Sequence, residues 1–317
     1  MYIEDLIKDI EELNEGADIY DMIIDIILYA DDILLLSNTK EGLQKMLDVT
    51  QKYGEKWEIK FNPDKTTFMV FGEKKKDKKK QPNNSDANLI FDGTIIKRVK
   101  TMKYLGVIFD ESLTNNKHLE TRRTMTYSAI TNINKVGFNI VDLKYNVKTI
   151  LYKTHIRPVL LYGLENHSIN QTELKKLQIT EAGIIKRSMG LTKHAKTNDL
   201  MNAMSIDLTK DRIKLIKFSF LGRLLKNDFT KNIYENINKQ ESNAIHKNSL
   251  IREIDKLTIV RNLDTETLKS TCTEEIKKVK KRINVEQTTV NITNIVKLLR
   301  EADQIKIKDT LNPYRKN

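Results

Sequence analysis

The sequence is poor in the residue types that build disulfide frameworks and zinc modules. It holds one cysteine in 317 residues, Cys272, which excludes an intramolecular disulfide and any cysteine-rich zinc module. A lone cysteine fits a chain that works in a reducing intracellular compartment. The five histidines are scattered without the spacing of metal ligands, which argues against a zinc site. They are His118, His155, His167, His194 and His246.

Long apolar segments are also missing. The N-terminus is acidic and has no apolar stretch of the kind that a signal peptide needs. The longest apolar run, residues 23–36, is interrupted by Asp25, Asp31 and Asp32, and it is too short and too charged to cross a bilayer. We therefore expect an intracellular, soluble protein, nuclear or cytoplasmic, with no membrane contact.

Glycine and proline are scarce, and hydrophobic residues make up 39% of the chain, which is enough for a real core. Lysine and arginine number 55 against 43 acidic residues, a formal charge of +12. Such an excess favours a polyanionic partner, and nucleic acid is the commonest one. The alternative is a basic protein encoded by AT-rich DNA, because lysine, isoleucine and asparagine are all abundant here.

Three basic clusters are candidates for phosphate contacts. Residues 74–80 hold six lysines, which could bind a phosphate backbone or act as a nuclear import signal. The simpler interpretation is a solvated loop. The pairs Arg122-Arg123 and Lys186-Arg187 would suit a surface that follows nucleic acid, although surface solvation explains them equally well.

The first third of the chain mixes helix and strand signals. Apolar spacing predicts a helix over residues 3–13, and Thr39 is a plausible N-cap for a second helix that ends near Trp57. Between them, β-branched residues predict a buried strand at 22–28 and a second strand at 33–36. Further strand signals follow at 67–71, at 89–96 as a hairpin around Asp92-Gly93, and at 104–109.

From about residue 114 the signals are helical. Apolar spacing predicts helices at 114–139, 145–156, 171–189 and 205–227, with weaker ones at 244–258, 264–282 and 288–302. The predicted fold class is α+β, with an incomplete α+β unit followed by an all-helical region. We expect three regions, residues 1–112, 113–200 and 201–317.

An acidic turn, Tyr29-Ala30-Asp31-Asp32, lies between the two predicted strands at 22–28 and 33–36. Adjacent carboxylates repel each other unless a cation offsets their charge. Nucleotidyl transfer uses such a pair, because two Mg²⁺ ions about 3.5–4 Å apart must be clamped by carboxylates. By itself an Asp-Asp turn is weak support, since ordinary hairpins also contain it.

The surroundings of this turn strengthen the functional interpretation. Leu28-Tyr29-Ala30-Asp31-Asp32-Ile33-Leu34-Leu35 resembles motif C of the reverse transcriptases of non-LTR (LINE-like) retrotransposons and group II introns. Other segments resemble the same family in the same order. They are residues 43–47 with Trp57 (the helix after motif C), Asn62-Pro63-Asp64-Lys65-Thr66 with Met69-Val70-Phe71 (motif D), Lys103-Tyr104-Leu105-Gly106-Val107 (motif E) and residues 151–163 with Lys176-Leu177-Gln178, Glu181, Arg187 and Gly190 (the segment after the thumb).

The resemblance covers roughly residues 1–190, and it implies a partial polymerase palm, an antiparallel sheet with helices, followed by a helical thumb and extension. The implied activity is RNA-directed DNA synthesis with two Mg²⁺ ions, an RNA template, a DNA primer and dNTPs. The runner-up is a non-catalytic nucleic-acid-binding remnant, and a third possibility is the product of a decayed retroelement.

The resemblance also implies roles for individual residues. Asp31 would be the metal-binding carboxylate of motif C, and Asp32 its less directly engaged neighbour. Tyr29 and Ala30 would lie near the primer end and the incoming nucleotide, and Lys65 would be a candidate general acid for the pyrophosphate leaving group or would neutralise phosphate charge. A lysine that faces solvent before a strand is the alternative for Lys65.

The hairpin residues Tyr104, Leu105 and Gly106 would help form the primer grip, with core packing as the alternative for Tyr104 and Leu105. In the family, motif C acts with a partner carboxylate in motif A and with motif B, and neither motif is found here. The nearby carboxylates Asp18, Asp21 and Asp25 are poorly placed to substitute. We therefore expect doubtful Mg²⁺ binding and no DNA synthesis by the chain alone, unless a partner supplies the missing palm and fingers.

Overall fold

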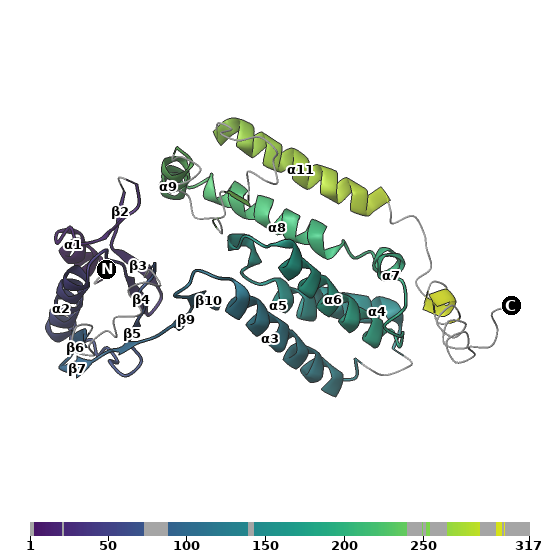
Figure 1. Ribbon diagram of the computed structural model, residues 1–317, viewed down its shortest axis with the longest axis horizontal. Helices are drawn as coiled ribbons and strands as arrows, with labels where there is room; N and C mark the ends of the chain where they lie inside the picture. Colours follow the sequence, from purple (N-terminus) through teal and green to yellow (C-terminus); the bar gives the residue numbers. More distant parts are fainter. Residues whose placement is uncertain are drawn as a thin grey trace. The chain divides into compact units, whose positions relative to one another are not determined.

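The computed structural model describes residues 3–20, 22–72, 88–138, 143–239, 249, 252–253, 265–285, 296–299 and 301. The chain forms two compact units, residues 1–114 with 231–245, and residues 115–230 with 246–317 (Figure 1). The first contains small sheets with helices and the second is mostly helical, so the predicted mixed α+β class is confirmed. The lysine cluster 74–80, and most of the helices predicted at 244–258 and 288–302, lie outside the described residues.

Two helices form the core of the first unit. Helix α1 (Ile3–Glu11) packs on α2 (Lys40–Trp57), and their contact buries Leu6, Ile10, Met46 and Tyr53. The predicted N-cap is confirmed, because the Thr39 hydroxyl accepts a hydrogen bond from the backbone N–H of Gly42 at 3.0 Å. Both helices agree closely with their predicted ranges.

The apolar run after α1 forms two hairpins. Strand β1 (Ala17–Asp18) pairs with β2 (Ile23–Ile24), and β3 (Ile26–Tyr29) pairs antiparallel with β4 (Asp32–Leu35). The prediction of one buried strand over residues 22–28 is wrong. Asp25 interrupts it, because its carboxylate accepts a hydrogen bond from the N–H of Ile26 at 2.8 Å. Within the described residues β3 and β4 form a two-stranded sheet, and Ile27 of β3 remains 41% exposed. In the neighbouring hairpin, Ile23 of β2 is 49% exposed.

The next strands are short. Strand β5 (Thr67–Phe68) runs parallel to β8 (Lys97–Arg98), so the strand predicted at 67–71 is present but ends at Phe68. Strands β6 (Ile90–Phe91) and β7 (Thr94–Ile95) form the hairpin predicted around Asp92-Gly93. Both turn residues have positive φ, as a tight two-residue hairpin turn requires.

A final hairpin corrects a further prediction. The expected single strand over residues 104–109 is instead the end of β9 (Thr101–Tyr104), a turn, and most of β10 (Val107–Asp110). Leu105 and Gly106 form the turn with φ of 45° and 79°. Glycine adopts this left-handed conformation freely, but leucine seldom does, so the residue pattern alone suggested a continuous strand.

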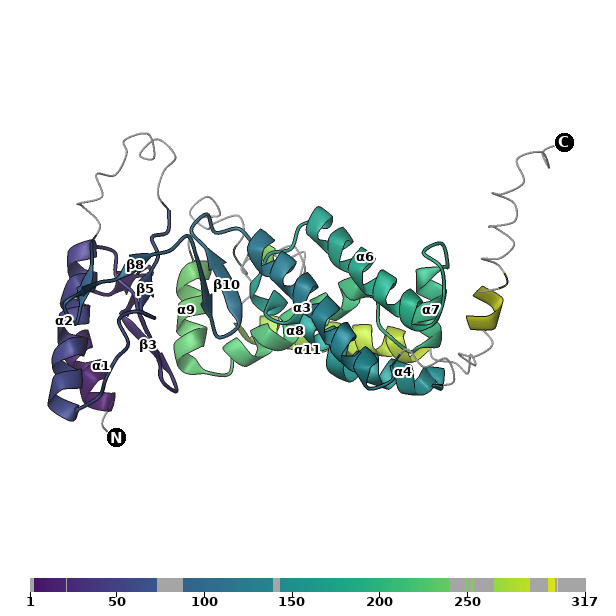
Figure 2. The same ribbon diagram turned by 90° about the horizontal axis from the view of Figure 1, so that it is seen from below.

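The second unit is a stack of helices. Its elements are α3 (Asn116–Lys135), α4 (Tyr145–Leu151), the π-helical turn η2 (Tyr152–Ile156), α5 (Arg157–Leu161), the 3₁₀ turn η3 (Leu164–Asn166), α6 (Gln171–Ser188), α7 (Thr197–Ala203), α8 (Thr209–Leu224) and α11 (Thr265–Val285). Helix α8 contacts α11 on one side and α6 with η3 on the other (Figures 1 and 2). The helices predicted at 114–139, 171–189, 205–227 and 264–282 are confirmed. Helices α7 and α9 (Asp228–Asn238) were not predicted.

A π-helical turn interrupts the helix predicted at 145–156. The backbone N–H of Arg157 donates to the carbonyl of Tyr152, five residues earlier. The next residue, Pro158, has no N–H and cannot continue an ordinary helical pattern through this point. Such extra-residue turns inside helices change which side chains share a face, and they are frequent at functional sites.

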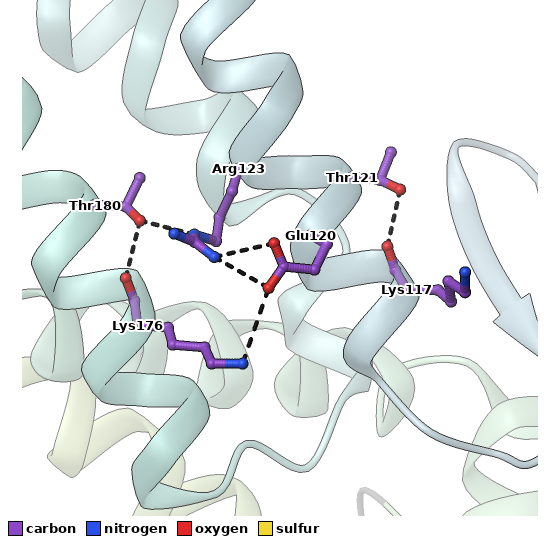
Figure 3. A network of polar contacts seen from close by, with 6 residues as sticks. All are labelled: Lys117, Glu120, Thr121, Arg123, Lys176 and Thr180. Carbon is purple, nitrogen blue, oxygen red and sulfur yellow. Dashed lines mark hydrogen bonds and ion pairs between the residues drawn. The ribbon is translucent and has the colours of Figure 1, made fainter.

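Helices α3 and α6 are also joined at their surface by a polar network (Figure 3). The guanidinium of Arg123 binds both carboxylate oxygens of Glu120 at 3.0 Å and donates to the Thr180 hydroxyl at 2.9 Å. Lys176 approaches the same carboxylate at 3.9 Å. Among the helices of the described residues, none is long and apolar enough to cross a bilayer.

Candidate active site

The acidic turn lies at the tip of the β3–β4 hairpin. Tyr29 pairs with Asp32 across the two strands, which leaves Ala30 and Asp31 as a two-residue turn. Ala30 has φ of 54°, a left-handed conformation that costs a residue with a side chain about 1–2 kcal/mol. Backbone strain of this kind concentrates at functional sites, where the surrounding structure maintains it.

The carboxylates of Asp31 and Asp32 are both exposed at this tip, and the neighbouring Tyr29 ring is 61% exposed. Carboxylate oxygens are the ligands that Mg²⁺ prefers, so the two side chains could form one side of a magnesium site. The described residues contain no group of three or more histidine, cysteine, aspartate or glutamate side chains that could hold a metal ion. The residues present therefore fit Mg²⁺ only in part.

The nearby carboxylates do not complete this site. Asp25 is buried and directly precedes β3, four residues before Tyr29. At about 3.3 Å per residue this places it roughly 13 Å from the start of the turn, too far to share an ion with Asp31. Asp18 pairs with Ile23 in the other hairpin, and Asp21 lies outside the described residues.

The β9–β10 hairpin places Tyr104, a second predicted site residue, close enough to the acidic turn for the charge of Asp32 to act on it. Burial raises the pKa of the Tyr104 phenol, and the negative charge of Asp32 raises it further. Within the described part of the chain, the Tyr104 hydroxyl is shielded from solvent and makes no hydrogen bond. Leu105 and Gly106 form the adjoining turn, where Leu105 is 39% exposed. A shielded phenol without a partner is a cost to folding.

The Tyr104 hydroxyl, which has no hydrogen-bond partner in the described residues, leads to a testable prediction. We expect Tyr104→Phe to leave the first unit equally stable or to stabilise it by up to about 1 kcal/mol, since it removes a buried polar atom without a partner. Urea unfolding followed by Trp57 fluorescence measures this, because Trp57 is the single tryptophan and lies in α2. Tyr53→Phe is the matched control, because it removes the hydroxyl of another tyrosine of the first unit. Destabilisation of more than about 1 kcal/mol by Tyr104→Phe would mean that the hydroxyl has a stabilising partner.

Lys65 lies apart from these groups. It is exposed in the turn before β5, where its backbone N–H donates to the Asn62 carbonyl at 3.2 Å. In the described structure no ion pair or hydrogen bond joins its side chain to Asp31 or Asp32. Its role as a general acid stays a prediction, as do the roles of the other site residues.

The predicted basic pairs are mostly engaged within the fold. Arg122 is 5% exposed and lies over the Tyr162 ring, 4.9 Å from its centre, so surface solvation does not describe it. Arg123 is bound to Glu120 and Thr180 (Figure 3). Lys186 is buried and donates to the Lys193 carbonyl at 3.0 Å, and Arg187 alone of the four is exposed.

Sequence reasoning missed a buried ionic cluster in the helical unit. Glu181 is fully buried, and its carboxylate accepts hydrogen bonds from the hydroxyls of Tyr152 and Thr209, each at 2.6 Å. It also pairs with the Arg157 Nε at 2.8 Å, and Arg157 pairs in turn with Asp207. The available signal was the position of Glu181 in α6, where it falls on the apolar face with Leu177, Ile184 and Ile185.

These buried charges alter the acidity of their neighbours. Burial raises the pKa of the Tyr152 phenol well above its usual value, and the Glu181 charge adds to the effect. Burial works against the charged form of Arg157, but the carboxylates of Glu181 and Asp207 outweigh it and raise the pKa of the guanidinium. The cluster therefore serves the fold of the helical unit.

Comparisons with known proteins relate the sequence of the first unit to a family of polymerases. Residues 1–109 match the family model described as reverse transcriptase (RNA-dependent DNA polymerase). The chain is 24% identical over 246 residues, 75% of its length, to the RNA-directed DNA polymerase from mobile element jockey of Drosophila melanogaster. It is 25% identical over 203 residues, 62% of its length, to the jockey polymerase of Drosophila funebris.

A third relative extends this set. The probable RNA-directed DNA polymerase from transposon BS of Drosophila melanogaster is 27% identical over 143 residues, 43% of this chain. The matches span 24%, 21% and 15% of the three relatives, so the chain corresponds to a quarter of their length or less. The first alignment is longer than the family match and thus includes part of the helical unit. Residues 1–109 therefore belong to the reverse transcriptase family, and the chain is similar over a longer stretch to RNA-directed DNA polymerases of jockey-like non-LTR retrotransposons.

Proposed function

We propose that this chain is the motif C side of a retrotransposon RNA-directed DNA polymerase. The first unit would be the back of the palm, and residues 113–200 and 201–317 would be the thumb and its helical extension. The observation that carries the proposal is the strained hairpin tip with the adjacent carboxylates Asp31 and Asp32, within the electrostatic range of Tyr104. The family match over residues 1–109 supports it.

The full reaction joins a primer 3′-hydroxyl to the α-phosphate of a dNTP opposite an RNA template, with Mg²⁺ as the metal that the family uses. In this scheme Asp31 and Asp32 place negative charge at the tip. Tyr29, Ala30 and the turn of Tyr104, Leu105 and Gly106 position the primer end. Lys65 offsets the charge of the departing pyrophosphate.

We propose that the chain alone does not synthesise DNA. Two adjacent carboxylates provide one side of a metal site, and the described residues offer no third ligand near them. In the described residues the β3–β4 hairpin is also a two-stranded sheet, with no third strand paired to it. A partner that supplies the rest of the palm and the fingers would complete both the sheet and the ligand set.

Primer extension tests this proposal. We expect purified chain with a primed RNA template, dNTPs and Mg²⁺ or Mn²⁺ to incorporate no nucleotide above the level of Asp31→Ala. Binding of the same sample to labelled RNA shows that the protein is competent. Incorporation that disappears in Asp31→Ala would mean that another carboxylate completes the site, and the proposal of an inactive chain would be wrong.

A second candidate function is nucleic-acid binding without catalysis, as a remnant of the polymerase. The excess positive charge of the chain favours it. Genomic DNA upstream separates the candidates, because motifs A and B encoded there in frame support a polymerase. Salt-sensitive RNA binding without extension is expected of both candidates. A chain that neither binds RNA nor extends a primer would instead be the product of a decayed element.

A further inference from the structure

Positive charge is divided unevenly between the two units. Residues 1–114 with 231–245 hold 19 basic and 24 acidic side chains, a net charge of 19 − 24 = −5. Residues 115–230 with 246–317 hold 36 basic and 19 acidic side chains, a net charge of 36 − 19 = +17. The helical unit therefore carries all of the excess positive charge, and a polyanion would be drawn to it rather than to the acidic turn.

Many basic side chains of the helical unit are not available to a partner. Arg122, Lys148, Arg157 and Lys217 are each 5% exposed or less. Lys148 donates to the Ser188 carbonyl at 3.0 Å, and Lys217 pairs with Glu253 at 2.7 Å. These residues support the fold, so a contact surface has to be sought among the exposed lysines.

Helix α11 separates its charges along its length. Its acidic residues Glu266, Glu274 and Glu275 lie in the first half, and after Glu275 its charged residues are all basic up to its end at Val285. The basic residues of this second half are Lys277, Lys278, Lys280, Lys281 and Arg282. The carboxylate of Glu275 binds Lys214 of α8 at 2.6 Å and Lys278 at 3.1 Å, which fixes the orientation of the helix on α8.

Three of these lysines point away from the packed side of α11. Leu268 and Cys272 are each 1% exposed and lie on the side of α11 that is covered, whereas Lys277, Lys280 and Lys281 are exposed. At about 100° per residue, the three lysines share an arc of roughly 100°, with Lys281 opposite Cys272. Within the described residues none of the three forms an ion pair. We call this set the α11 basic face.

The helix dipole does not account for this arrangement. Cations are favoured within the last turn of a helix, and the effect falls off beyond it. Helix α11 ends at Val285, so the last turn begins at Arg282 and excludes all three lysines. They repel one another instead, since like charges three or four positions apart destabilise a helix. An anionic partner would relieve this repulsion.

We propose that the α11 basic face binds the phosphate backbone of a nucleic acid. Phosphate contacts of this kind position a protein without reading sequence, and exposed lysines suit them as point charges. A membrane surface is the weaker match, because a helix that binds lipid needs an exposed apolar face and α11 covers Leu268 and Cys272. The binding requires neither Mg²⁺ nor Asp31, so it is independent of the polymerase proposal.

A matched pair of triple variants of the full chain tests this site. One is Lys277→Gln/Lys280→Gln/Lys281→Gln, and the other is Lys175→Gln/Lys193→Gln/Lys196→Gln, which removes three exposed charges elsewhere in the helical unit. Binding is measured by fluorescence anisotropy with labelled single-stranded RNA and with a DNA duplex of the same length. The buffer contains EDTA and no dNTP, and salt is varied. Vesicles containing phosphatidylserine are the lipid arm.

We expect the α11 variant to bind on the order of 10-fold more weakly at low salt and to lower the slope of log K against log salt by about 2–3, one phosphate contact for each lysine. The control variant should change both quantities much less. Equal losses in the two variants, or no loss in the α11 variant, would overturn the site. Vesicle binding that depends on these lysines while RNA and DNA binding do not would overturn it as well. Thermal unfolding of both variants confirms that they fold.

Discussion

Replacing Glu181 with alanine is expected to destabilise the helical unit by about 3–5 kcal/mol, the cost of breaking a buried ion pair from one side. The carboxylate of Glu181 is fully buried, accepts hydrogen bonds from the hydroxyls of Tyr152 and Thr209, and forms an ion pair with Arg157. The substitution leaves both hydroxyls without this acceptor and leaves the Arg157 guanidinium, itself 5% exposed, with Asp207 alone. Glu181→Gln should lose less, because an amide oxygen can still accept one of these hydrogen bonds.

Two spectroscopic probes localise this effect. Far-ultraviolet circular dichroism follows mainly the helical unit, and fluorescence of the single residue Trp57 follows the first unit. Glu120→Ala is the matched control, because Glu120 binds Arg123 and Lys176 on the surface of α3 and α6 (Figure 3) and is 55% exposed. Its loss should stay below about 1 kcal/mol. Equal losses for Glu120→Ala and Glu181→Ala would refute the special weight given to the buried cluster.

Mild acid is expected to destabilise the helical unit through a stacked pair of histidines. The rings of His118 and His167 lie 4.7 Å apart and nearly parallel. His118 is fully buried, with its Nε2 2.9 Å from the Tyr162 carbonyl, and the His167 Nδ1 lies 2.6 Å from the Gly163 carbonyl. A carbonyl can only accept, so each ring donates through that nitrogen in its neutral form.

The surroundings disfavour protonation of both rings. Burial lowers the pKa of His118 to about 4, the hydrogen bond to Tyr162 opposes this, and the charge of Arg122 adds to the lowering. Burial also lowers the pKa of His167, helped by Lys217 and opposed by the carboxylates of Glu165 and Glu173. The native state therefore holds neutral histidines where the unfolded chain would take up protons.

The pH window follows from these values. Above pH 6.5 both states are neutral and the pair contributes no pH dependence. Between pH 6.5 and about 4, His118 takes up a proton in the unfolded chain but stays neutral in the folded protein. The free energy of unfolding therefore falls by about 3 kcal/mol over this window, at 1.36 kcal/mol per pH unit. Protonation of His167 in the unfolded chain acts in the same direction.

Urea unfolding at a series of pH values measures this loss by circular dichroism. His118→Gln keeps a donor for the Tyr162 carbonyl but cannot titrate, so its stability should depend less steeply on pH over the window. His194→Gln, at an exposed position, should keep the wild-type profile. A His118→Gln profile as steep as that of the wild type would show that other groups cause the acid sensitivity.

Elements with local signals could be predicted from the sequence. The helix that begins after Thr39 has its N-cap and its apolar spacing within one segment of the sequence. The two residues Asp92-Gly93 are by themselves typical of a hairpin turn, and the structure has a hairpin there. The acidic turn at Asp31-Asp32 was found in the same way. Predictions failed where a tertiary effect overrode the local pattern. Leu105 takes a left-handed turn conformation that its residue type disfavours.

Relations between distant segments were the part that the sequence could not provide. The proximity of Asp32 and Tyr104 depends on how two hairpins fold together, and no periodicity records it. The burial of Arg122 between helices is equally invisible, since an arginine pair in a helix has the same pattern whether it faces solvent or the Tyr162 ring. The domain boundaries at 112 and 200 and the roles of the site residues stay predictions.

The π-helical turn at Tyr152–Ile156 has a consequence for chain length in related proteins. It accommodates one residue more than an α-helix would, and Tyr152 and Arg157, five positions apart, both reach Glu181. Deleting one residue there would restore a regular helix in which the two residues are four positions apart and lie about 40° from each other around the axis. Positions with this spacing share a face, so relatives with a one-residue gap in this segment should keep the Arg157–Glu181 pair.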